Sequence, residues 1–423
     1  MDLLIHPSSG LRGERFIPGD KSISHRALLI GALAEGTTTI RGLSASADVQ
    51  STLSCLKSLG VEIEDDSSTI VIHGKGPRGF KKPFAPLNAG NSGTTMRLLS
   101  GILAGQRFDS VIIGDASLSK RPMKRIIEPL RLMGANISGS ADSTAPLHIS
   151  STYNLRPIDY ELNLPSAQVK STILLAGLYA DGVTHVIEEI PTRDHTERML
   201  GLKVQARGRK RSIEIKGGQK VAARSLSVPG DISAATFLIA AAAIIPNSEL
   251  IIRNVGMNKT RTAVLDVFRK MNVSFELANE REEGGEQLGD IIAKTSALRT
   301  DVTLRGESIP LLIDELPMLA VMALFGKGQF TLRDATELRH KESDRIAAVV
   351  QNMTTLGVDV VEYHDGLSFH PKDNLAGGTL QSFGDHRIAM AFGIAGLRIP
   401  GVTICNAECV DISFPGFWDA IQA

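Results

Sequence analysis

The chain has 423 residues, more than one ordinary hydrophobic core holds, so we expect two or three domains. Hydrophobic residues make up 43% and charged residues 22%, which is typical of a globular protein and excludes a disordered or fibrous one. The 46 Lys and Arg residues equal the 46 Asp and Glu residues, which argues against a nucleic-acid-binding or polybasic membrane-binding protein. Three cysteines without a CxxC motif indicate a reducing compartment rather than a disulfide framework.

The sequence also argues against a membrane protein. The apolar run Phe237 to Ile245 is too short to span a bilayer, and the N-terminus lacks the basic-then-apolar pattern of a signal peptide. We therefore expect a cytoplasmic protein.

Six apolar, Ala-rich segments recur roughly every 70 residues. Each follows a polar turn and leads into a β-like run, and each stops at Gly or Asn, which enter the left-handed backbone region at little cost. The six stops are Gly36, Gly105, Gly182, Asn247, Gly328 and Gly401. Because these segments are almost wholly apolar, they predict buried helices.

A second, amphipathic helix is expected inside the repeats. It ends at Gly or Asn in CLKSLG, PLRLMG, VFRKMN and NMTTLG, and an alternating strand-like run follows each of these stops. Each repeat therefore reads as strand, helix, strand, helix, strand. Two features lie outside this pattern: we expect Glu280 to Gly289 to form an exposed hairpin loop, and the first twenty residues to pair with the last strands of the second half.

Six repeats exceed one core, so we group them three and three, with the boundary near Val228-Pro229-Gly230. The predicted N-terminal domain is 21–229, and the predicted C-terminal domain is 1–20 plus 230–423.

Polar residues gather at the predicted starts of the buried helices. Gly-Asp occurs at four turns (at Asp20, Asp115, Asp231 and Asp385), where Asp can simply cap the helix. A helix N-terminus is also an anion site, and Lys and Arg there would bind phosphate or carboxylate. The alternative is a set of solvated charges on separate loops. The polar residues in question are Lys21, Ser22, Arg26, Arg97, Arg121, Gln168, Lys170, Arg193, Lys341, Arg345 and Arg387.

Two carboxylates lie among these cations. Asp314 stands in the apolar run LLIDELPML, and Glu342 stands between Lys341 and Arg345. Carboxylates in such surroundings suit proton transfer, although Asp314 could equally cap the following helix. The sequence has no HExxH motif or other clustered ligand spacing, so we predict no metal site, and it has neither a P-loop nor a dinucleotide fingerprint.

Seven motifs taken in order resemble the 5-enolpyruvylshikimate-3-phosphate synthase family. They are GDKSISHR (19–26), GNSGTTMRLL (90–99), SKRPMKRI (119–126), SAQVKSTILLAGL (166–178), RDHTERM (193–199), HKESDRI (340–346) and FGDHRIAM (383–390). The resemblance implies an α/β fold: a two-domain inside-out α/β barrel of six βαβαββ units, three per domain, with the active site in the interdomain cleft.

The same resemblance implies an enzyme that transfers the enolpyruvyl group of phosphoenolpyruvate to the 5-hydroxyl of shikimate 3-phosphate, without cofactor or metal and as a monomer. It implies catalytic roles for Asp314 as the base, with Glu342 or Lys21 as the proton donor. The implied shikimate 3-phosphate ligands are Lys21, Ser22, Arg26, Ser166, Ala167, Gln168, Arg193, Asp314 and Lys341. The implied phosphoenolpyruvate ligands are Lys21, Asn91, Gly93, Thr94, Arg121, Gln168, Arg345, His386 and Arg387.

The chain departs from the family pattern at two positions. Ile412 stands where many members carry Lys, and Leu98 stands where Pro often follows the loop Arg. Glyphosate sensitivity is left open, because Ser92 and Ala167 resemble insensitive members and Gly93 resembles sensitive ones. Two alternatives remain: a UDP-N-acetylglucosamine enolpyruvyl transferase, although GDASLSKR (114–121) lacks the Cys of that family, and a non-catalytic binding scaffold.

Overall fold

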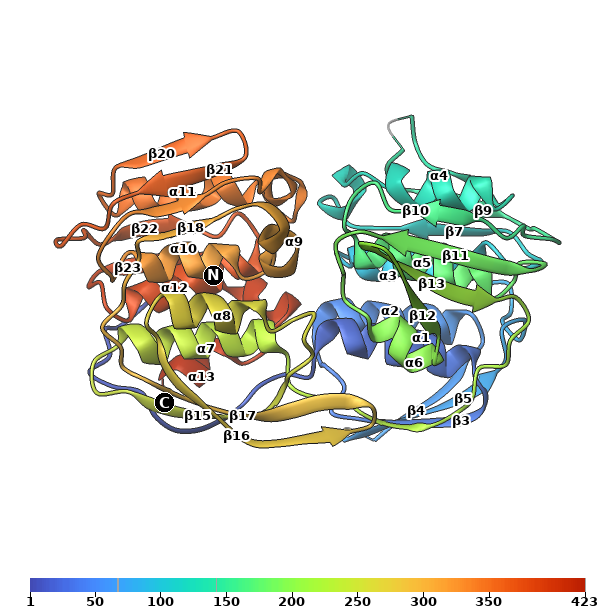
Figure 1. Cartoon of the computed structure of the whole chain (residues 1–423), viewed down its shortest axis with the longest axis horizontal. Helices are drawn as coiled ribbons and strands as arrows, with labels where there is room; N and C mark the ends of the chain where they lie inside the picture. The colour runs from blue at the N-terminus through green and yellow to red at the C-terminus, as the bar shows by residue number, and fades with distance from the viewer. Residues whose placement is uncertain (67, 142, 423) are drawn as a thin grey trace. The chain divides into compact units, whose positions relative to one another are not determined.

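The computed structural model describes residues 1–66, 68–141 and 143–422 (Figure 1). The chain forms two compact units: an N-terminal unit, Gly19–Val228, and a C-terminal unit, Met1–Pro18 with Pro229–Ala423.

The N-terminal unit contains three repeats, each with one four-stranded sheet. The first repeat consists of β14 (Ser225–Ser227), α1 (Lys21–Leu33), β3 (Glu35–Arg41), α2 (Ala47–Ser58), β4 (Glu62–Asp65) and β5 (Thr69–Lys75). The second consists of β6 (Leu87–Asn88), α3 (Gly93–Leu103), β7 (Ser110–Ile113), η1 (Leu118–Lys120), α4 (Lys124–Leu132), β8 (Asn136–Ser138) and β9 (Leu147–Ser150). The third consists of β10 (Asp159–Glu161), α5 (Ala167–Gly177), β11 (Val183–Glu188), α6 (His195–Leu200), β12 (Lys203–Arg207) and β13 (Lys210–Lys216).

The C-terminal unit repeats the pattern with strands taken from both ends of the chain. The fourth repeat consists of β2 (Arg12–Phe16), α7 (Ile232–Ile244), β15 (Glu249–Gly256), α8 (Ala263–Lys270), β16 (Ser274–Glu283) and β17 (Glu286–Lys294). The fifth consists of β18 (Val302–Leu304), η2 (Gly306–Ser308), α9 (Ile309–Leu312), α10 (Leu316–Ala323), β19 (Phe330–Leu332), η3 (Thr336–His340), α11 (Arg345–Thr355), β20 (Val360–Tyr363) and β21 (Gly366–Phe369). The sixth consists of β22 (Gly378–Gln381), α12 (His386–Gly396), β23 (Val402–Cys405), η4 (Ala407–Ile412), α13 (Phe417–Gln422) and β1 (Leu3–Leu4).

All six sheets share one pattern of strand pairing, although the sixth has three strands and the others four. Two strands of each repeat are parallel, as in β10 beside β11, and one of them also pairs with an antiparallel strand, as in β11 beside β13. A parallel pair needs a crossover, and the apolar helix supplies it in four repeats, as α5 does between β10 and β11. The first and fourth repeats differ: α1 follows β2 but leads to β3, which pairs with β14, and α7 follows β14 but leads to β15, which pairs with β2. The predicted six-repeat α/β fold is therefore confirmed, with three repeats in each unit.

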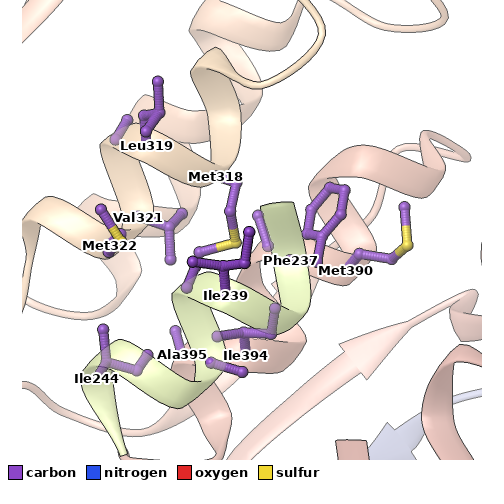
Figure 2. Packing of buried hydrophobic residues seen from close by; sticks show 14 of the residues in the cluster. Phe237, Ile239, Ile244, Met318, Leu319, Val321, Met322, Met390, Ile394 and Ala395 are labelled. Atoms are coloured by element: carbon purple, nitrogen blue, oxygen red, sulfur yellow. The ribbon is translucent and has the colours of Figure 1, made fainter. Parts of the chain in front are cut away.

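The apolar helices form the interior of each unit. Every residue of α7 is buried, and Figure 2 shows its Phe237 and Ile239 packed with Met318 of α10 and Ile394 of α12. Alanine-rich helices can approach one another closely because their side chains are short. Each sheet turns one face to these helices, as in β11, where alternate residues are buried. Helices at the centre and sheets outside make each unit an inside-out α/β barrel.

The amphipathic helices stop where predicted, but the apolar helices end two to five residues before their predicted stops, which lie near the starts of the next strands. The backbone at Gly36, Gly182, Asn247, Gly328 and Gly401 has positive φ, as does that at Gly60, Gly134, Asn272 and Gly357 after the amphipathic helices. Gly105 is not in the positive-φ set; a Cβ there would lie 2.1 Å from the Tyr179 ring. The close approach of an aromatic ring, rather than backbone conformation, therefore requires glycine at this stop.

Two local expectations were correct only in part. Glu280 to Gly289 lies in an exposed hairpin, as predicted, but its loop is short, because β16 runs to Glu283, β17 begins at Glu286, and Glu282 pairs with Gln287. The first twenty residues pair with both ends of the C-terminal unit: β1 pairs with β23 as expected, but β2 pairs with β15, the first strand of that unit after the boundary.

We expect Ile239→Ala to lower the free energy of unfolding by about 2–5 kcal/mol, because it leaves a cavity between three buried helices. Urea denaturation followed by circular dichroism measures the change. The matched control is Val361→Ala on β20, whose side chain is 54% exposed and whose loss should cost about 0.5 kcal/mol or less. Equal effects of the two substitutions would contradict the helix-centred core.

Candidate active site

Capping side chains define the starts of the buried helices. Asp20 Oδ1 accepts a hydrogen bond from the Ile23 N–H (2.8 Å), and Ser92 Oγ accepts one from the Thr95 N–H (3.1 Å). Ser166 caps α5 in the same way. Asp231 and Asp385 also cap helices, whereas Asp115 accepts from the Leu118 N–H ahead of a 3-10 turn. The predicted caps are thus present, and most of the predicted anion-binding residues lie beside them.

The first turns of α1 carry three of the predicted ligands. Lys21 Nζ lies 2.8 Å from Asp48 Oδ2, so its ammonium is held by a carboxylate on α2. Arg26 is buried, and its Nε donates to Thr196 Oγ1 (2.8 Å) and its Nη2 to Ser171 Oγ (2.8 Å). These contacts tie α1 to α5 and α6.

Arg193 approaches the same helix start from the loop between β11 and α6. Its Nη1 donates to Ser22 Oγ (3.2 Å). A guanidinium, a hydroxyl and an ammonium therefore lie together at the start of α1, which is a suitable arrangement for a phosphate group.

Gln168 joins the starts of α3 and α5. Its Nε2 donates to Thr94 Oγ1 (2.9 Å), and its Oε1 accepts from Arg97 Nη1 (2.6 Å). Arg97 thus serves to orient Gln168. The two helix N-termini, both rich in backbone N–H donors, are held side by side by one amide side chain.

Arg121 lies over the loop that precedes α3. Its Nη2 donates to Asn91 Oδ1 (2.5 Å) and its Nη1 to the Asn91 carbonyl (3.3 Å). A Cβ at Gly93 would lie 3.6 Å from Arg121 Nη1 and 2.6 Å from Arg97 Nη1. Glycine at this position therefore leaves the guanidiniums room beside the loop. The N-terminal cluster is defined here as Lys21, Ser22, Arg26, Asn91, Gly93, Thr94, Arg121, Ser166, Ala167, Gln168 and Arg193.

Lys170 does not belong to this cluster, although the sequence grouped it with the anion-binding cations. Its side chain is 0% exposed, and its Nζ lies 2.7 Å from Glu197 Oε1 and 3.1 Å from Glu188 Oε2. Lys170 is two residues, about half a turn, farther along α5 than Gln168, so it points into the unit rather than to a ligand. The sequence pattern could not show this, because a cation near a helix start has the same position in the sequence whether it faces a ligand or pairs with a buried carboxylate.

The C-terminal unit brings its predicted residues together around Asp314. Asp314 Oδ1 lies 3.7 Å from Arg345 Nη1 and 3.6 Å from Arg387 Nε, and its carbonyl accepts from Arg387 Nη1 (3.0 Å). Glu342 Oε2 accepts from Arg345 Nη2 (2.7 Å). The C-terminal cluster is defined as Asp314, Lys341, Glu342, Arg345, His386 and Arg387.

Arg345 is the centre of the C-terminal cluster. It is 1% exposed, and its Nε donates to Asp385 Oδ2 (2.8 Å). Burial disfavours its charge, but Asp385, Glu342 and Asp314 outweigh burial and raise the pKa of the guanidinium. Burial likewise opposes ionisation of Asp385, yet Arg345 holds the pKa of that carboxyl below its usual value. Both groups are therefore charged.

Lys341 lies at the edge of the C-terminal cluster. Its Nζ is 3.5 Å from Glu337 Oε1. Burial lowers the pKa of the ammonium, and the carboxylates of Glu337, Asp314 and Glu342 partly oppose that effect.

Asp314 is not a helix cap, so one of the two interpretations left open by the sequence was wrong. Glu315 occupies the cap position of α10, and no side-chain cap bond is formed there. The sequence also gave no sign of Asp48 as the partner of Lys21, because the pairing depends on how α2 packs against α1. Asp385 was predicted as a possible helix cap, and its Oδ1 accepts a hydrogen bond from the Arg387 N–H (2.9 Å), but its carboxylate also forms an ion pair with Arg345.

In the described part of the chain, one group has a metal-ligand arrangement: Glu62, Glu64 and His73, whose ligand atoms lie within 4.8 Å of one another. Both glutamates are exposed on the β4–β5 hairpin, and His73 Nε2 is 2.8 Å from Glu64 Oε1. A histidine–glutamate contact accounts for this group, and it involves neither cluster. None of the helices in the described ranges is long and apolar enough to cross a membrane.

The fold is that of the enolpyruvyl transferases. The enolpyruvyl transferase NikO from Streptomyces tendae has the same fold, with a TM-score of 0.78 over 99% of this chain and 96% of that one, at 17% sequence identity. EPSP synthase from Acinetobacter baumannii matches with a TM-score of 0.86 and 44% identity over 99% of this chain and 97% of that one.

Sequence comparisons identify the family within this class. The family model for EPSP synthase (3-phosphoshikimate 1-carboxyvinyltransferase) matches residues 5–421. A 3-phosphoshikimate 1-carboxyvinyltransferase from Pelobacter propionicus is 48% identical over 421 residues, 99% of this chain and 97% of the relative. The same enzyme from Salinibacter ruber is 49% identical over 423 residues, 99% and 98%. The chain belongs to the EPSP synthase family.

His25, on the same helix as Lys21 and Arg26, makes the stability of the N-terminal unit depend on pH. It is fully buried in α1, and its Nδ1 lies 2.7 Å from Thr52 Oγ1. Burial, together with the charges of Lys21 and Arg26, lowers the pKa of the imidazole well below 6.5. The folded protein therefore holds His25 neutral, while the unfolded chain binds a proton there more readily.

We expect acid to weaken folding through His25. The contribution of neutral His25 to the free energy of unfolding is fully present above about pH 6.5. It is lost as the pH falls below that value, because only the unfolded state gains the proton. In His25→Asn, whose amide can still bond Thr52, the thermal midpoint should fall less between pH 7 and pH 5 than in the wild type. The control His370→Asn, at an exposed position, should keep the wild-type pH dependence. A steeper acid dependence in His25→Asn would contradict this assignment.

Proposed function

We propose that this chain catalyses the reaction for which its family is named, transfer of the enolpyruvyl group of phosphoenolpyruvate to the 5-hydroxyl of shikimate 3-phosphate. The 5-hydroxyl loses its proton to the proposed base, and its oxygen forms a bond to C2 of phosphoenolpyruvate. The methylene carbon of phosphoenolpyruvate takes up a proton in the same step. The resulting intermediate then loses phosphate and one methyl proton, which restores the double bond. The observation that carries this proposal is Asp314, a carboxylate within 4 Å of two buried guanidiniums.

Both substrates carry a phosphate group, and phosphoenolpyruvate also carries a carboxylate, so a binding site needs several cations and N–H donors. The proposed shikimate 3-phosphate ligands come mainly from the N-terminal cluster. Lys21, Ser22 and Arg193 meet at the start of α1. Ser166, Ala167 and Gln168 open α5, where backbone N–H groups and the helix dipole favour an anion. Arg26 braces this set, and Asp314 and Lys341 complete the proposed ligands.

The proposed phosphoenolpyruvate ligands are the arginines and the α3 loop. Arg121 lies over Asn91, Gly93 and Thr94, and its contacts already shape that loop. In the C-terminal cluster, Arg345 Nη1 has no hydrogen-bond partner within the described residues, although it is buried. A buried guanidinium N–H needs an acceptor, and a carboxylate or phosphate oxygen of the substrate supplies one. Lys21, Gln168, His386 and Arg387 are the remaining proposed ligands.

Asp314 is the proposed base. Arg345 and Arg387 stabilise its carboxylate. When Asp314 takes the proton from the 5-hydroxyl, the two guanidiniums would face the negative charge that develops on the substrate oxygen. The proton for the methylene comes from Glu342 or Lys21, and both are paired here, Glu342 with Arg345 and Lys21 with Asp48. Exclusion of water by closure around the substrates would strengthen all of these interactions.

The two competing functions make different predictions. The family resemblance gives a UDP-N-acetylglucosamine enolpyruvyl transferase a Cys in the loop that here reads GDASLSKR, and no Cys stands there. A binding scaffold does not need Asp314. Phosphate release on mixing the protein and phosphoenolpyruvate with shikimate 3-phosphate tests the proposal. UDP-N-acetylglucosamine in place of the shikimate is the comparison, and release with it alone would favour the sister reaction.

We expect Asp314→Asn to lower kcat by about 10²- to 10⁴-fold, because an amide cannot accept the hydroxyl proton. Shikimate 3-phosphate binding, measured by calorimetry, should change little, since the amide keeps the size of the side chain. Asp359→Asn, at an exposed position of the same unit, is the matched control and should retain wild-type turnover. Wild-type kcat in Asp314→Asn would refute the base assignment.

We expect Arg121→Ala to raise KM for phosphoenolpyruvate about 10- to 100-fold, the loss of one or two charge-assisted hydrogen bonds. KM for shikimate 3-phosphate should change by about threefold or less. Initial-rate kinetics with each substrate varied in turn give the two values. Arg131→Ala, an exposed arginine on α4, should alter neither. Equal rises in both Michaelis constants would argue that Arg121 is not a phosphoenolpyruvate ligand.

That the protein acts as a monomer in the cytoplasm stays a prediction from the sequence. Light scattering coupled to size-exclusion chromatography tests the oligomeric state.

A further inference from the structure

A buried charge network of the N-terminal unit lies beneath the N-terminal cluster and outside the proposed ligand set. Lys170 on α5 contacts Glu188 at the end of β11 and Glu197 on α6. Arg211 on β13 donates to Glu188 Oε1 (2.5 Å). Two cations face two carboxylates, so the network is neutral. A buried carboxylate or ammonium must be paired in this way, because an uncompensated charge in the interior is costly.

The network holds the backbone as well as the side chains. Glu188 Oε2 accepts from both the N–H (3.1 Å) and the hydroxyl (2.8 Å) of Thr192, and Lys170 Nζ donates to the Thr192 carbonyl (3.3 Å). Lys170 therefore grips the loop at Thr192 and the following helix at Glu197. These two attachments lie on either side of Arg193.

Arg193 itself projects from the loop to Ser22 at the start of α1. The loop that bears it has no regular secondary structure between β11 and α6, so its backbone is set by side-chain contacts. Thr196 Oγ1 accepts a hydrogen bond from Arg26 Nε and contacts Ser171 Oγ. These two contacts hold the start of α6 against α1 and α5. The position of the Arg193 guanidinium thus depends on groups that lie beneath it.

We propose that Lys170 is a positioning residue for shikimate 3-phosphate: by binding Glu188, Glu197 and the Thr192 carbonyl, it holds the Arg193 loop in the geometry that receives the substrate phosphate. This inference rests on the proposed function, in which Arg193 is a ligand of that substrate. Lys170 does not contact the substrate, because its side chain is 0% exposed. The alternative is a purely structural role, in which Lys170 only neutralises two buried carboxylates.

Lys170→Met should change KM for shikimate 3-phosphate but not KM for phosphoenolpyruvate. The substitution keeps the apolar stem and removes the ammonium, so it releases the Thr192 carbonyl and leaves one carboxylate uncompensated. KM for shikimate 3-phosphate is expected to rise at least about tenfold, whereas KM for phosphoenolpyruvate and kcat should change by about threefold or less. Lys210→Met is the matched control, because Lys210 pairs with Glu161 on the exposed side of the same sheet. Its kinetic constants should equal those of the wild type.

The double variant Lys170→Met/Glu197→Gln distinguishes positioning from neutralisation. Glu188 keeps Arg211 as its partner, so the buried network is again neutral, but the bond from Lys170 Nζ to Thr192 is still absent. The thermal midpoint should therefore recover toward the wild-type value while KM for shikimate 3-phosphate stays raised. This variant also carries the test if Lys170→Met alone does not fold.

The outcomes separate the two proposals. If the wild type releases no phosphate with both substrates, the proposed function fails, whatever the variants do. If the wild type turns over normally and KM for shikimate 3-phosphate is unchanged in the folded variants, the positioning role is overturned. Recovery of that KM together with the thermal midpoint in the double variant would also overturn it, because charge balance alone would then explain the network.

Discussion

Pairing of buried charge is the constraint on which the rest of this structure depends. Helix starts in both units carry cations that an anionic substrate would need, yet a buried cation also needs a partner within the protein. Arg345 is held by Asp385 and Glu342, Lys21 by Asp48, and Lys170 by two glutamates. The partners orient the cations as well as stabilise them, so the same contacts that permit folding arrange the binding groups.

The repeated architecture explains why so many of these groups lie at helix starts. Each apolar helix follows one strand and leads into another, so its N-terminal turn lies just after the end of a strand, and a polar capping residue is needed there. Asp20, Ser92 and Ser166 fill that role in the N-terminal unit. Backbone N–H groups, caps and neighbouring cations are therefore concentrated in that unit, where three repeats supply three such turns.

Particular residues show how far sequence reasoning reached. The buried helices, and the amphipathic helices with their Gly and Asn stops, were predicted because periodicity and backbone preference act locally. Lys170 was misjudged because its partner Glu188 is distant in sequence, and Asp48 was missed because its partner Lys21 is distant. The length of the loop in the Glu280 hairpin was overestimated because exposed paired strands and loops share a polar composition. Asp314 could be either a cap or a base candidate until the helix start was seen to lie at Glu315.

The amino-acid sequence by itself determined the six-repeat α/β organisation, the residues at the helix starts and, through its motifs, the enolpyruvyl transferase family. Only the tertiary structure decided which cations lie at a helix start and which are paired in the interior, as Arg193 and Lys170 illustrate. The physical reason is that helix formation and capping depend on neighbours within a few residues, whereas the partner of a buried charge is set by packing between elements that the sequence places far apart.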